Sequence, residues 1–435
     1  MNHVIVVDLG YGDSGKGGVV DWLCAGSGEG GRPGRGGGAG WLGSAGAVHA
    51  VVRFNGGAQA AHNVVTADGR HHSFAQFGSG TFTPGVRTHL SRFMLVDPLA
   101  LAAEAAHLAS VGVGDALDRL TVDREALLTT PYHRAANRAR ELARGQDRHG
   151  SCGVGIGETM RYALDHPDDA PRVADCAAPR TLTRKLGMLR DRLADELGPL
   201  DAPGVVGVCD AYLAFAGRVA LVDRGYLQQL LGTGPVVFEG AQGVLLDEWR
   251  GFHPYTTWST TTFANAETLL AEAGETALRL GVVRCYLTRH GPGPFVTEDP
   301  TLELPEPHNR RGAWQGAFRV GHQDAVALRY AVEVAGGVDA VALTHLDTAA
   351  RHPLRLGRSY QVDAQRMTRI TPGPPRDLGW QERLTGILRR ARPEYSGLVG
   401  DWPGVIEDVV GAPVVLRSSG PTAGHKQAVQ AALLA

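Results

Sequence analysis

The residues best suited to chemistry lie near the start of the chain, where Gly10-Tyr-Gly12-Asp13-Ser-Gly15-Lys16-Gly17 directly follows an apolar run at 4–9. A short β-branched run that leads through a glycine-rich turn into a helix is typical of a phosphate-binding loop. The N–H groups of residues 14–17 would face a polyphosphate, and Lys16 would add a point charge. The Ser or Thr that normally follows the lysine and holds Mg²⁺ is Gly17 here. We therefore expect Asp13 to take over the metal.

Five further stretches join a strand-like run to polar residues. They are Arg53-Phe-Asn55-Gly-Gly57-Ala-Gln59-Ala-Ala61-His62-Asn63, Phe238-Glu239-Gly240-Ala241-Gln242-Gly243 with its continuation to Ser259, Leu287-Thr-Arg289-His-Gly-Pro-Gly-Pro294-Phe-Val-Thr297-Glu298, Leu343-Thr344-His345-Leu346-Asp347, and Ser418-Ser419-Gly420-Pro421. Each stretch alone also fits an ordinary turn or strand end. A carboxylate at a strand end, such as Asp347, can accept the N1–H and N2–H of guanine, a donor pair that adenine lacks.

The pattern of apolar runs and helical segments predicts an α/β fold with a largely parallel central sheet flanked by helices. Expected strands are 4–9, 48–54, 93–96, 236–239, 281–287, 338–346 and 414–417; expected helices are 15–24, 98–110, 134–144, 182–196, 209–218, 324–335, 380–390 and 424–433. Ligands of such sheets bind at the carboxyl ends of strands, where most of the six stretches fall. We expect one domain over 1–435, with a flexible glycine-rich insert at 25–47.

Composition narrows the functional classes. The net charge of −2 over 435 residues argues against a nucleic-acid or anionic-membrane surface. No apolar run reaches the roughly 18 residues of a membrane-spanning helix, and the chain starts almost directly in a strand, which argues against a secretory signal. The five cysteines are scattered without a CxxC pair, so neither a zinc site nor a disulfide framework is indicated. A cytoplasmic protein is expected.

Together and in this order, the six stretches resemble the adenylosuccinate synthetase family over nearly the whole chain. The resemblance implies a variant of the P-loop NTPase fold, a homodimer and a role in purine biosynthesis. It implies Mg²⁺ and GTP, with ATP as the alternative donor. The family phosphorylates the 6-oxygen of inosine monophosphate, and the amino group of aspartate then displaces the phosphate. Such a reaction needs a base beside N1 and a group that stabilises the 6-oxyanion.

The resemblance also implies roles for single residues. Asp13 is the base and a Mg²⁺ ligand, His62 is the acid that assists phosphoryl transfer, and Lys16 contacts the transferring group. The carbonyl of Ala61 is a second metal ligand. The implied nucleotide-binding residues are Gly12, Ser14, Gly15, Gly17, His345, Asp347, Ser419, Gly420 and Pro421. The implied substrate-binding residues are Gln59, Cys152, Gln242, Thr257 and Arg319, of which Gln242 holds the purine edge.

The chain departs from the family in the nucleotide-binding loop. Where the family reads Gly-Asp-Glu-Gly-Lys-Gly-Lys, Ser14 and Gly18 replace the glutamate and the second lysine. The usual Thr-Lys-Leu-Asp is Thr-His-Leu-Asp, so His345 removes an aliphatic stem that packs along the base. The preference for GTP over ATP therefore stays open.

The substrate pockets depart further. Gln59 replaces the asparagine that helps to hold the 5′-phosphate, and Cys152 replaces a phosphate-binding threonine with a weaker donor. The arginine expected from the partner subunit has no counterpart near 164–169. Each lost charge-assisted contact removes about 1.5–3 kcal/mol. Of the arginines in the aspartate loop only Arg319 stays in place, although Arg310 and Arg311 lie just upstream.

Three hypotheses remain open at this stage. The first is a ligase that joins aspartate to inosine monophosphate. The second is a ligase of the same type whose purine-like acceptor, amine donor or both differ, as in a specialised pathway. The third is a nucleotide-binding regulatory protein that has lost ligase activity, which would explain the altered substrate contacts but not the retained Asp13 and His62.

Overall fold

The structure is a computed structural model that describes residues 3–25, 47–309, 312 and 314–429. Nearly all of the glycine-rich insert predicted at 25–47 therefore lies outside the described residues, and so do Arg310 and Arg311. Within the described ranges, no helix is both long and apolar enough to cross a membrane.

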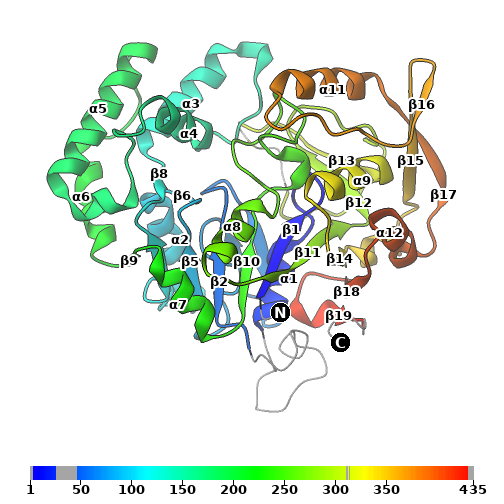
Figure 1. Cartoon of the computed structure of the whole chain (residues 1–435), viewed down its shortest axis with the longest axis horizontal. Coiled ribbons are helices and arrows are strands. Elements are labelled where there is room, and N and C mark those ends of the chain that lie inside the picture. Colours follow the sequence, from blue (N-terminus) through cyan, green and yellow to red (C-terminus); the bar gives the residue numbers. More distant parts are fainter. Residues whose placement is uncertain (1–2, 26–46, 310–311, 313, 430–435) are drawn as a thin grey trace.

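A ten-stranded sheet runs through the middle of the molecule (Figure 1). Its order is β19 (Lys426–Ala428), β18 (Val414–Ser418), β14 (Ala340–Thr344), β11 (Ala277–Arg284), β1 (His3–Asp8), β10 (Val236–Glu239), β2 (Ala50–Arg53), β5 (Arg87–Leu90), β7 (Leu120–Asp123) and β9 (Ala220–Val222). All neighbouring pairs are parallel except β18 and β19. The predicted α/β class with a largely parallel sheet is confirmed.

Helices pack against the central sheet, against the smaller sheets beside it and against one another. They are α1 (Lys16–Cys24), α2 (Pro98–Ser110), α3 (Pro131–Ala143), α4 (Ile156–Asp165), α5 (Pro179–Leu197), α6 (Val205–Ala216), α7 (Gly225–Thr233), α8 (Ala264–Glu272), α9 (Ala325–Val334), α10 (Leu346–Ala349), α11 (Leu378–Arg390) and α12 (Trp402–Val410). Strand β1 is buried along its whole length because both faces of the sheet are packed. Val4 and Val6 join one apolar cluster with α1, whereas Ile5 and Val7 join the other.

Smaller sheets flank the central one. The largest contains β12 (Tyr286–His290), β13 (Phe318–Asp324), β15 (Arg355–Val362), β16 (Gln365–Met367) and β17 (Arg392–Leu398). A hairpin joins β3 (His62–Val65) to β4 (His71–Phe74), and β6 (Leu95–Val96) pairs with β8 (Leu127–Leu128). The strand predicted at 281–287 is in fact divided at Cys285 between β11 and β12, which belong to different sheets.

Two further element predictions are corrected. The strand expected at 93–96 is only the two-residue β6 and lies outside the central sheet. The helix expected at 424–433 is wrong at 426–428, where the chain forms β19 along the edge of β18. Main-chain hydrogen bonds to a free sheet edge outweigh the weak local preference of this segment for a helix. Residues 430–433 of that expected helix lie beyond the described residues.

The segment after β10 passes very close to the loop between β1 and α1. The N–H of Leu245 donates to the carbonyl of Gly10 at 3.0 Å. A Cβ added at Gly243 would overlap the main chain at both Gly10 and Gly12. Gly243 therefore sets how closely these two strand ends approach each other.

We predict that Gly243→Ala pushes the loop away from β10 and lowers the free energy of unfolding by about 1–3 kcal/mol, as overpacking does. Nucleotide affinity falls with it, because the loop changes shape. Denaturant unfolding and calorimetric nucleotide titration measure both effects. The matched control is Gly187→Ala in α5, where a Cβ meets nothing within 4 Å. A Gly243→Ala protein with unchanged stability and affinity would contradict this account.

Candidate active site

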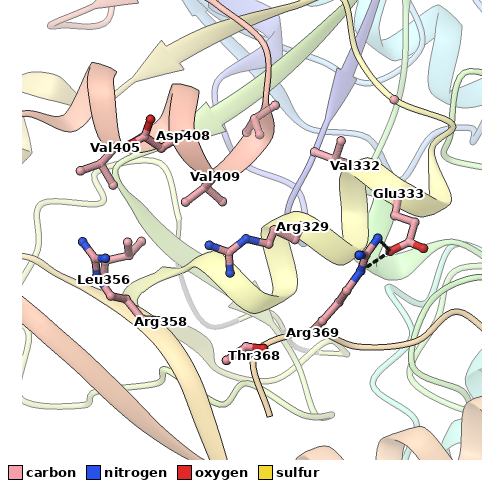
Figure 2. Close-up of a pocket in the computed structure, with 12 residues that line it drawn as sticks. Arg329, Val332, Glu333, Leu356, Arg358, Thr368, Arg369, Val405, Asp408 and Val409 are labelled. Atoms are coloured by element: carbon pink, nitrogen blue, oxygen red, sulfur yellow. Dashed lines mark hydrogen bonds and ion pairs between the residues drawn. The ribbon is translucent and has the colours of Figure 1, made fainter.

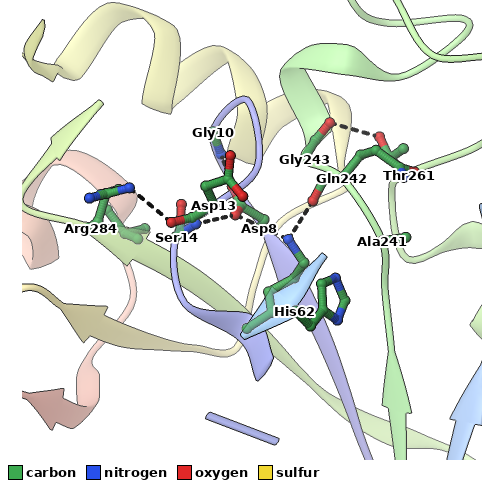
Figure 3. A network of polar contacts seen from close by, with 12 residues as sticks. Asp8, Gly10, Asp13, Ser14, His62, Ala241, Gln242, Gly243, Thr261 and Arg284 are labelled. Atoms are coloured by element: carbon green, nitrogen blue, oxygen red, sulfur yellow. Dashed lines mark hydrogen bonds and ion pairs between the residues drawn. The ribbon is translucent and has the colours of Figure 1, made fainter. Parts of the chain in front are cut away.

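The loop that follows β1 is closed by the carboxylate of Asp8, which is fully buried at the end of the strand. Its Oδ1 accepts from the N–H of Gly10 at 2.8 Å. Its Oδ2 accepts from the N–H of Ser14 at 2.9 Å and from the ammonium of Lys16 at 3.2 Å (Figure 3). Sequence reasoning missed Asp8, although a carboxylate ending an otherwise apolar buried strand was a usable signal.

Side chains from two neighbouring strands hold the carbonyl groups of the same loop. Arg284, at the end of β11, donates to the carbonyl of Asp13 at 2.9 Å, and the Thr344 hydroxyl donates to the carbonyl of Ser14 at 2.7 Å. Asp13 itself has a φ of 60°, a left-handed conformation that few non-glycine residues adopt. The loop is therefore held in a strained shape by β1, β11 and β14 together.

These contacts change which N–H groups can meet a phosphate. Ser14 was predicted to offer its N–H to the ligand, but Asp8 takes that N–H. The N–H groups of Gly15, Lys16 and Gly17 have no acceptor among the described residues. They begin α1, where unpaired N–H groups and the helix dipole favour an anion. Lys16 donates to the carbonyl of Gln242 at 2.5 Å in addition to Asp8.

The missing hydroxyl at position 17 has a steric explanation. A Cβ added at Gly17 would lie only 2.9 Å from the Cβ of His62 and 3.2 Å from the carbonyl of Asn63. Strand β3 thus passes directly over the start of α1, and Gly17 permits this approach. The same approach brings the predicted acid His62 beside the loop.

His62 is oriented by a buried carboxylate. Its Nδ1 lies 2.6 Å from Oε1 of Glu239, and Glu239 also accepts from the N–H of Ser79 at 2.8 Å. Burial alone would raise the pKa of Glu239, but Arg53, His62 and Ser79 lower it to about 2. The ionised Glu239 therefore accepts the Nδ1–H, which leaves Nε2 of His62 for a ligand. Burial lowers the pKa of His62, and Glu239 opposes that effect.

The predicted base Asp13 is paired with His290. Nε2 of His290 lies 3.2 Å from Oδ2 of Asp13. Burial alone would raise the pKa of Asp13, but the hydrogen bond and charge of His290, with Lys16 and Arg284, hold it below the usual value. Asp13 is therefore ionised at neutral pH, as a base must be. Glu239 and His290 both lie in stretches that sequence reasoning had noted, but no spacing rule indicated these pairings.

Many of the predicted catalytic and nucleotide-binding residues line one cavity of about 620 Å³. It is lined by the predicted Asp13, Gly15, Lys16, Gly17, Ala61, His62, His345, Asp347, Gly420 and Pro421, and also by Gly18, Ser418 and Lys426. Gly12, Ser14 and Ser419 belong to the same loops without lining the cavity. One ligand can therefore contact α1, β3, α10 and the turn after β18.

This cavity is also lined by the residues predicted to recognise the base of the nucleotide, Asp347 and His345. Asp347 is the second residue of α10 and pairs with the exposed Arg351 at 2.7 Å through one carboxylate oxygen. His345 has a φ of 60° and lies 2.9 Å from the hydroxyl of Thr344. Burial keeps the pKa of His345 well below its usual value, so the imidazole is neutral. Among the described residues the other oxygen of Asp347 has no hydrogen-bond partner, so it can accept from a base.

The predicted substrate-binding residues do not line this cavity. Arg319 is engaged by both oxygens of Glu298 and by the carbonyls of Gly291 and Gly293, at 3.1 and 3.0 Å. All three of its nitrogens are therefore occupied within the protein. Burial raises the pKa of the Cys152 thiol, which keeps it neutral. A neutral thiol is a poor partner for a phosphate dianion.

The other predicted substrate-binding residues differ in their surroundings. The amide nitrogen and oxygen of the Gln59 side chain are both buried without partners among the described residues. The side-chain oxygen of Gln242 is also buried without a hydrogen-bond partner among the described residues. Thr257 is anchored through its N–H to the carbonyl of Leu246 at 2.8 Å. Gln59 and Gln242 thus retain unused hydrogen-bonding groups for a ligand.

The described donor atoms suit Mg²⁺. This ion binds one or two protein oxygens and completes its shell with water and substrate phosphates. Asp13, which carries a carboxylate, and Ala61, which carries a main-chain carbonyl, both line the same cavity. No group of three or more His, Cys, Asp or Glu that could hold a metal occurs within the described residues, so the nucleotide would supply the remaining ligands.

A second cavity, of about 740 Å³, lies between α9, β15 and α12 (Figure 2). Its lining includes Arg329, Arg358 and Asp408, and a pair at 3.0 Å between Arg369 and Glu333. None of its lining residues comes from the six sequence stretches. The candidate active site is therefore the smaller cavity.

Comparisons with known proteins give the same family that the six sequence stretches resemble. The family described as Adenylosuccinate synthetase matches residues 5–426. The adenylosuccinate synthetase of Desulfovibrio desulfuricans is 31% identical over 94% of this chain and 90% of its own. That of Alkalilimnicola ehrlichii is 33% identical over 96% of each chain.

Solved structures share the fold. The fully ligated adenylosuccinate synthetase from Plasmodium falciparum has a TM-score of 0.82 at 21% identity, covering 99% of this chain and 100% of that one. The cyanophage S-2L succinoaminodeoxyadenylate synthetase has a TM-score of 0.60 at 19% identity, covering 99% and 96%.

We predict that Glu239→Gln lowers kcat by about 10²- to 10⁴-fold, the range that a positioned acid or base contributes. Glu239 raises the pKa of His62, so its loss lowers that pKa. The fall of kcat at high pH, where His62 loses its proton, therefore shifts to lower pH. Steady-state kinetics across pH measures both effects. The control is Glu394→Gln on the surface of β17. An unchanged kcat and pH profile would contradict the role of Glu239.

Proposed function

Because the chain belongs to the adenylosuccinate synthetase family, we propose that it is a C–N ligase of this family with an altered acceptor or amine donor. The family uses GTP and Mg²⁺, phosphorylates a purine-type carbonyl oxygen and lets an amine displace the phosphate. The proposal for this chain is that the phosphorylating half of the reaction is kept and that the choice of partners has changed.

The occupied guanidinium of Arg319 is the observation that carries the proposal. A dicarboxylate such as aspartate needs about two cationic or well-directed sets of donors. Arg319 instead gives its nitrogens to Glu298 and to two carbonyls. Gln59 and Cys152 likewise weaken the site expected for a 5′-phosphate. By contrast, Asp13 and the His62–Glu239 pair keep the groups that phosphorylation requires.

The proposed mechanism follows from the positions of these groups. The ionised Asp13 accepts the proton from N1 of the acceptor, which makes its carbonyl oxygen nucleophilic. That oxygen attacks the γ-phosphorus, and the bond to the β–γ bridging oxygen breaks. His62, held by Glu239, stabilises the charge that develops on the reacting oxygen. The N–H groups at the start of α1 and Lys16 bind the phosphates. The amine then attacks the activated carbon, and phosphate leaves.

Mg²⁺, when bound, neutralises phosphate charge during this transfer. We propose Asp13 and the carbonyl of Ala61 as its protein ligands. The pairing of Asp13 with His290 keeps the carboxylate ionised, which a metal ligand also requires. Asp347 is proposed to read the base of the nucleotide, and its free oxygen is the supporting observation.

A solved structure of the same fold supports the proposal that the phosphate donor and the acceptor can vary. The cyanophage protein of this fold is named as a succinoaminodeoxyadenylate synthetase bound to dGMP and to dATP as an energy donor. By analogy, the same fold in this chain is proposed to tolerate a purine nucleotide other than inosine monophosphate. GTP is the donor that the family implies, and ATP is the alternative to test.

The assembly and the location of the protein belong to the same proposal. We propose a homodimer and a cytoplasmic enzyme, both on the basis of the family alone. Sedimentation of the full chain measures the first directly.

We predict that phosphate release from GTP and Mg²⁺ depends on a purine-type acceptor together with an amine, and that this pair differs from inosine monophosphate and aspartate in at least one member. The test is a panel of acceptors and amines, with Asp13→Asn as the control that loses turnover but still binds nucleotide. Robust turnover with inosine monophosphate and aspartate alone would overturn the altered specificity. Binding of nucleotide without turnover for any pair would instead favour a regulatory protein.

A further inference from the structure

The start of α1 and the last described strand meet at Gly18. A Cβ added at Gly18 would lie 3.1 Å from Nζ and 3.3 Å from Cε of Lys426, and 3.7 Å from the carbonyl of Pro421. Lys426 begins β19, and antiparallel pairing with Ser418 fixes its main chain. The ammonium of Lys426 therefore occupies the space into which a side chain at position 18 would extend.

The ammonium is buried without a close carboxylate. Lys426 is 6% exposed, and its Nζ donates to the carbonyls of Pro421 at 3.3 Å and Thr422 at 3.0 Å. Asp21, one turn further along α1, is the acidic group whose charge acts on it, but the two form no ion pair within the described residues. Burial lowers the pKa of Lys426 to about 8, and Asp21 opposes this effect. A buried cation in this condition gains much from an anionic ligand.

That ligand has a place to bind. Lys426 lines the same 620 Å³ cavity as Lys16, Gly17 and Asp347. Gly15, Lys16 and Gly17 line this cavity at the start of α1, where their N–H groups can meet an anion, and Lys426 lines it from β19. Lys16 is partly neutralised by Asp8, so Lys426 is the less compensated of the two cations.

We propose that Lys426 is the second cation of the nucleotide site and that its ammonium, delivered across Gly18 by β19, binds the phosphate chain of the nucleotide donor. The inference rests on the proposed function, since it assumes a nucleoside triphosphate in this cavity. It also explains Gly18. A lysine at position 18 would need the space that Lys426 occupies. The second cation is therefore supplied by β19 and not by the loop.

The proposal makes the two positions interdependent. Removing Lys426 leaves the phosphates short of one charge, and adding a lysine at position 18 restores a charge to the same space. In the presence of Lys426, by contrast, Gly18→Lys crowds two ammonium groups together. A purely structural role for Lys426 in anchoring β19 would not be repaired from α1.

Calorimetric titration of the full chain with GTP, its non-hydrolysable analogue and GMP, in Mg²⁺ and without acceptor or amine, tests the proposal. We expect Lys426→Thr to weaken triphosphate binding about 10- to 100-fold, the worth of a charge-assisted contact, and to affect GMP less. Gly18→Lys in the Lys426→Thr background restores most of that loss. Gln427→Thr, on the exposed face of the same strand, is the matched control.

Each outcome decides one point. Equal triphosphate affinity of the wild type and Lys426→Thr overturns the proposal, and so does a double variant that binds no better than Lys426→Thr. If Lys426→Thr does not fold, Lys426→Met and Lys426→Arg take its place, and equal affinity of those two variants overturns the proposal. A wild type that binds neither triphosphate would refute the proposed function itself, which keeps the two failures apart.

Discussion

The whole site depends on one buried carboxylate, that of Asp8 at the end of the central strand. An ionised group in this position is costly unless it is paired and hydrogen-bonded, and Asp8 meets that requirement with two N–H groups and the Lys16 ammonium. These three contacts bend residues 10–16 into a closed loop. Because Ser14 is used in this way, the N–H groups that remain for a ligand are those at the start of α1. The loop shape is thus set by contacts from inside the sheet.

The remaining groups are arranged around this loop by neighbouring strands. Strand β10 contributes Glu239, which orients His62, while β11 and β14 hold the loop through Arg284 and Thr344. Glu239, Arg284 and Thr344 stand at the carboxyl ends of parallel strands, where side chains from distant parts of the sequence meet. Of the residues expected to select acceptor and amine, four lie in connecting segments, namely Gln59, Cys152, Gln242 and Thr257. The fifth, Arg319, lies in β13 of the smaller sheet. Connecting segments vary more easily than strand ends, which fits the proposal that the phosphorylating groups are kept while the substrate pockets have changed.

Much of the framework could be predicted because it depends on local patterns. The apolar run at 4–9 and the segment 236–239 are strands, and 98–110 is a helix with the expected bounds. The contacts that make the site work are not local. Glu239 lies 177 residues from His62, and nothing in either segment indicates the partner. Arg319 was assigned from its position alone, and its pairing with Glu298 emerges only when the segment after β12 lies beside β13. The final segment has helical character but forms a strand because β18 offers a free edge.

The central claim is that the chain retains phosphorylation of a purine-type carbonyl oxygen. Its most direct test labels that oxygen with ¹⁸O in the acceptor that supports turnover and follows the released phosphate by ³¹P NMR. The account predicts one ¹⁸O atom in each phosphate, because the acceptor oxygen leaves with the phosphoryl group when the amine displaces it. Unlabelled phosphate, with the label kept in the purine or lost to water, would contradict the account.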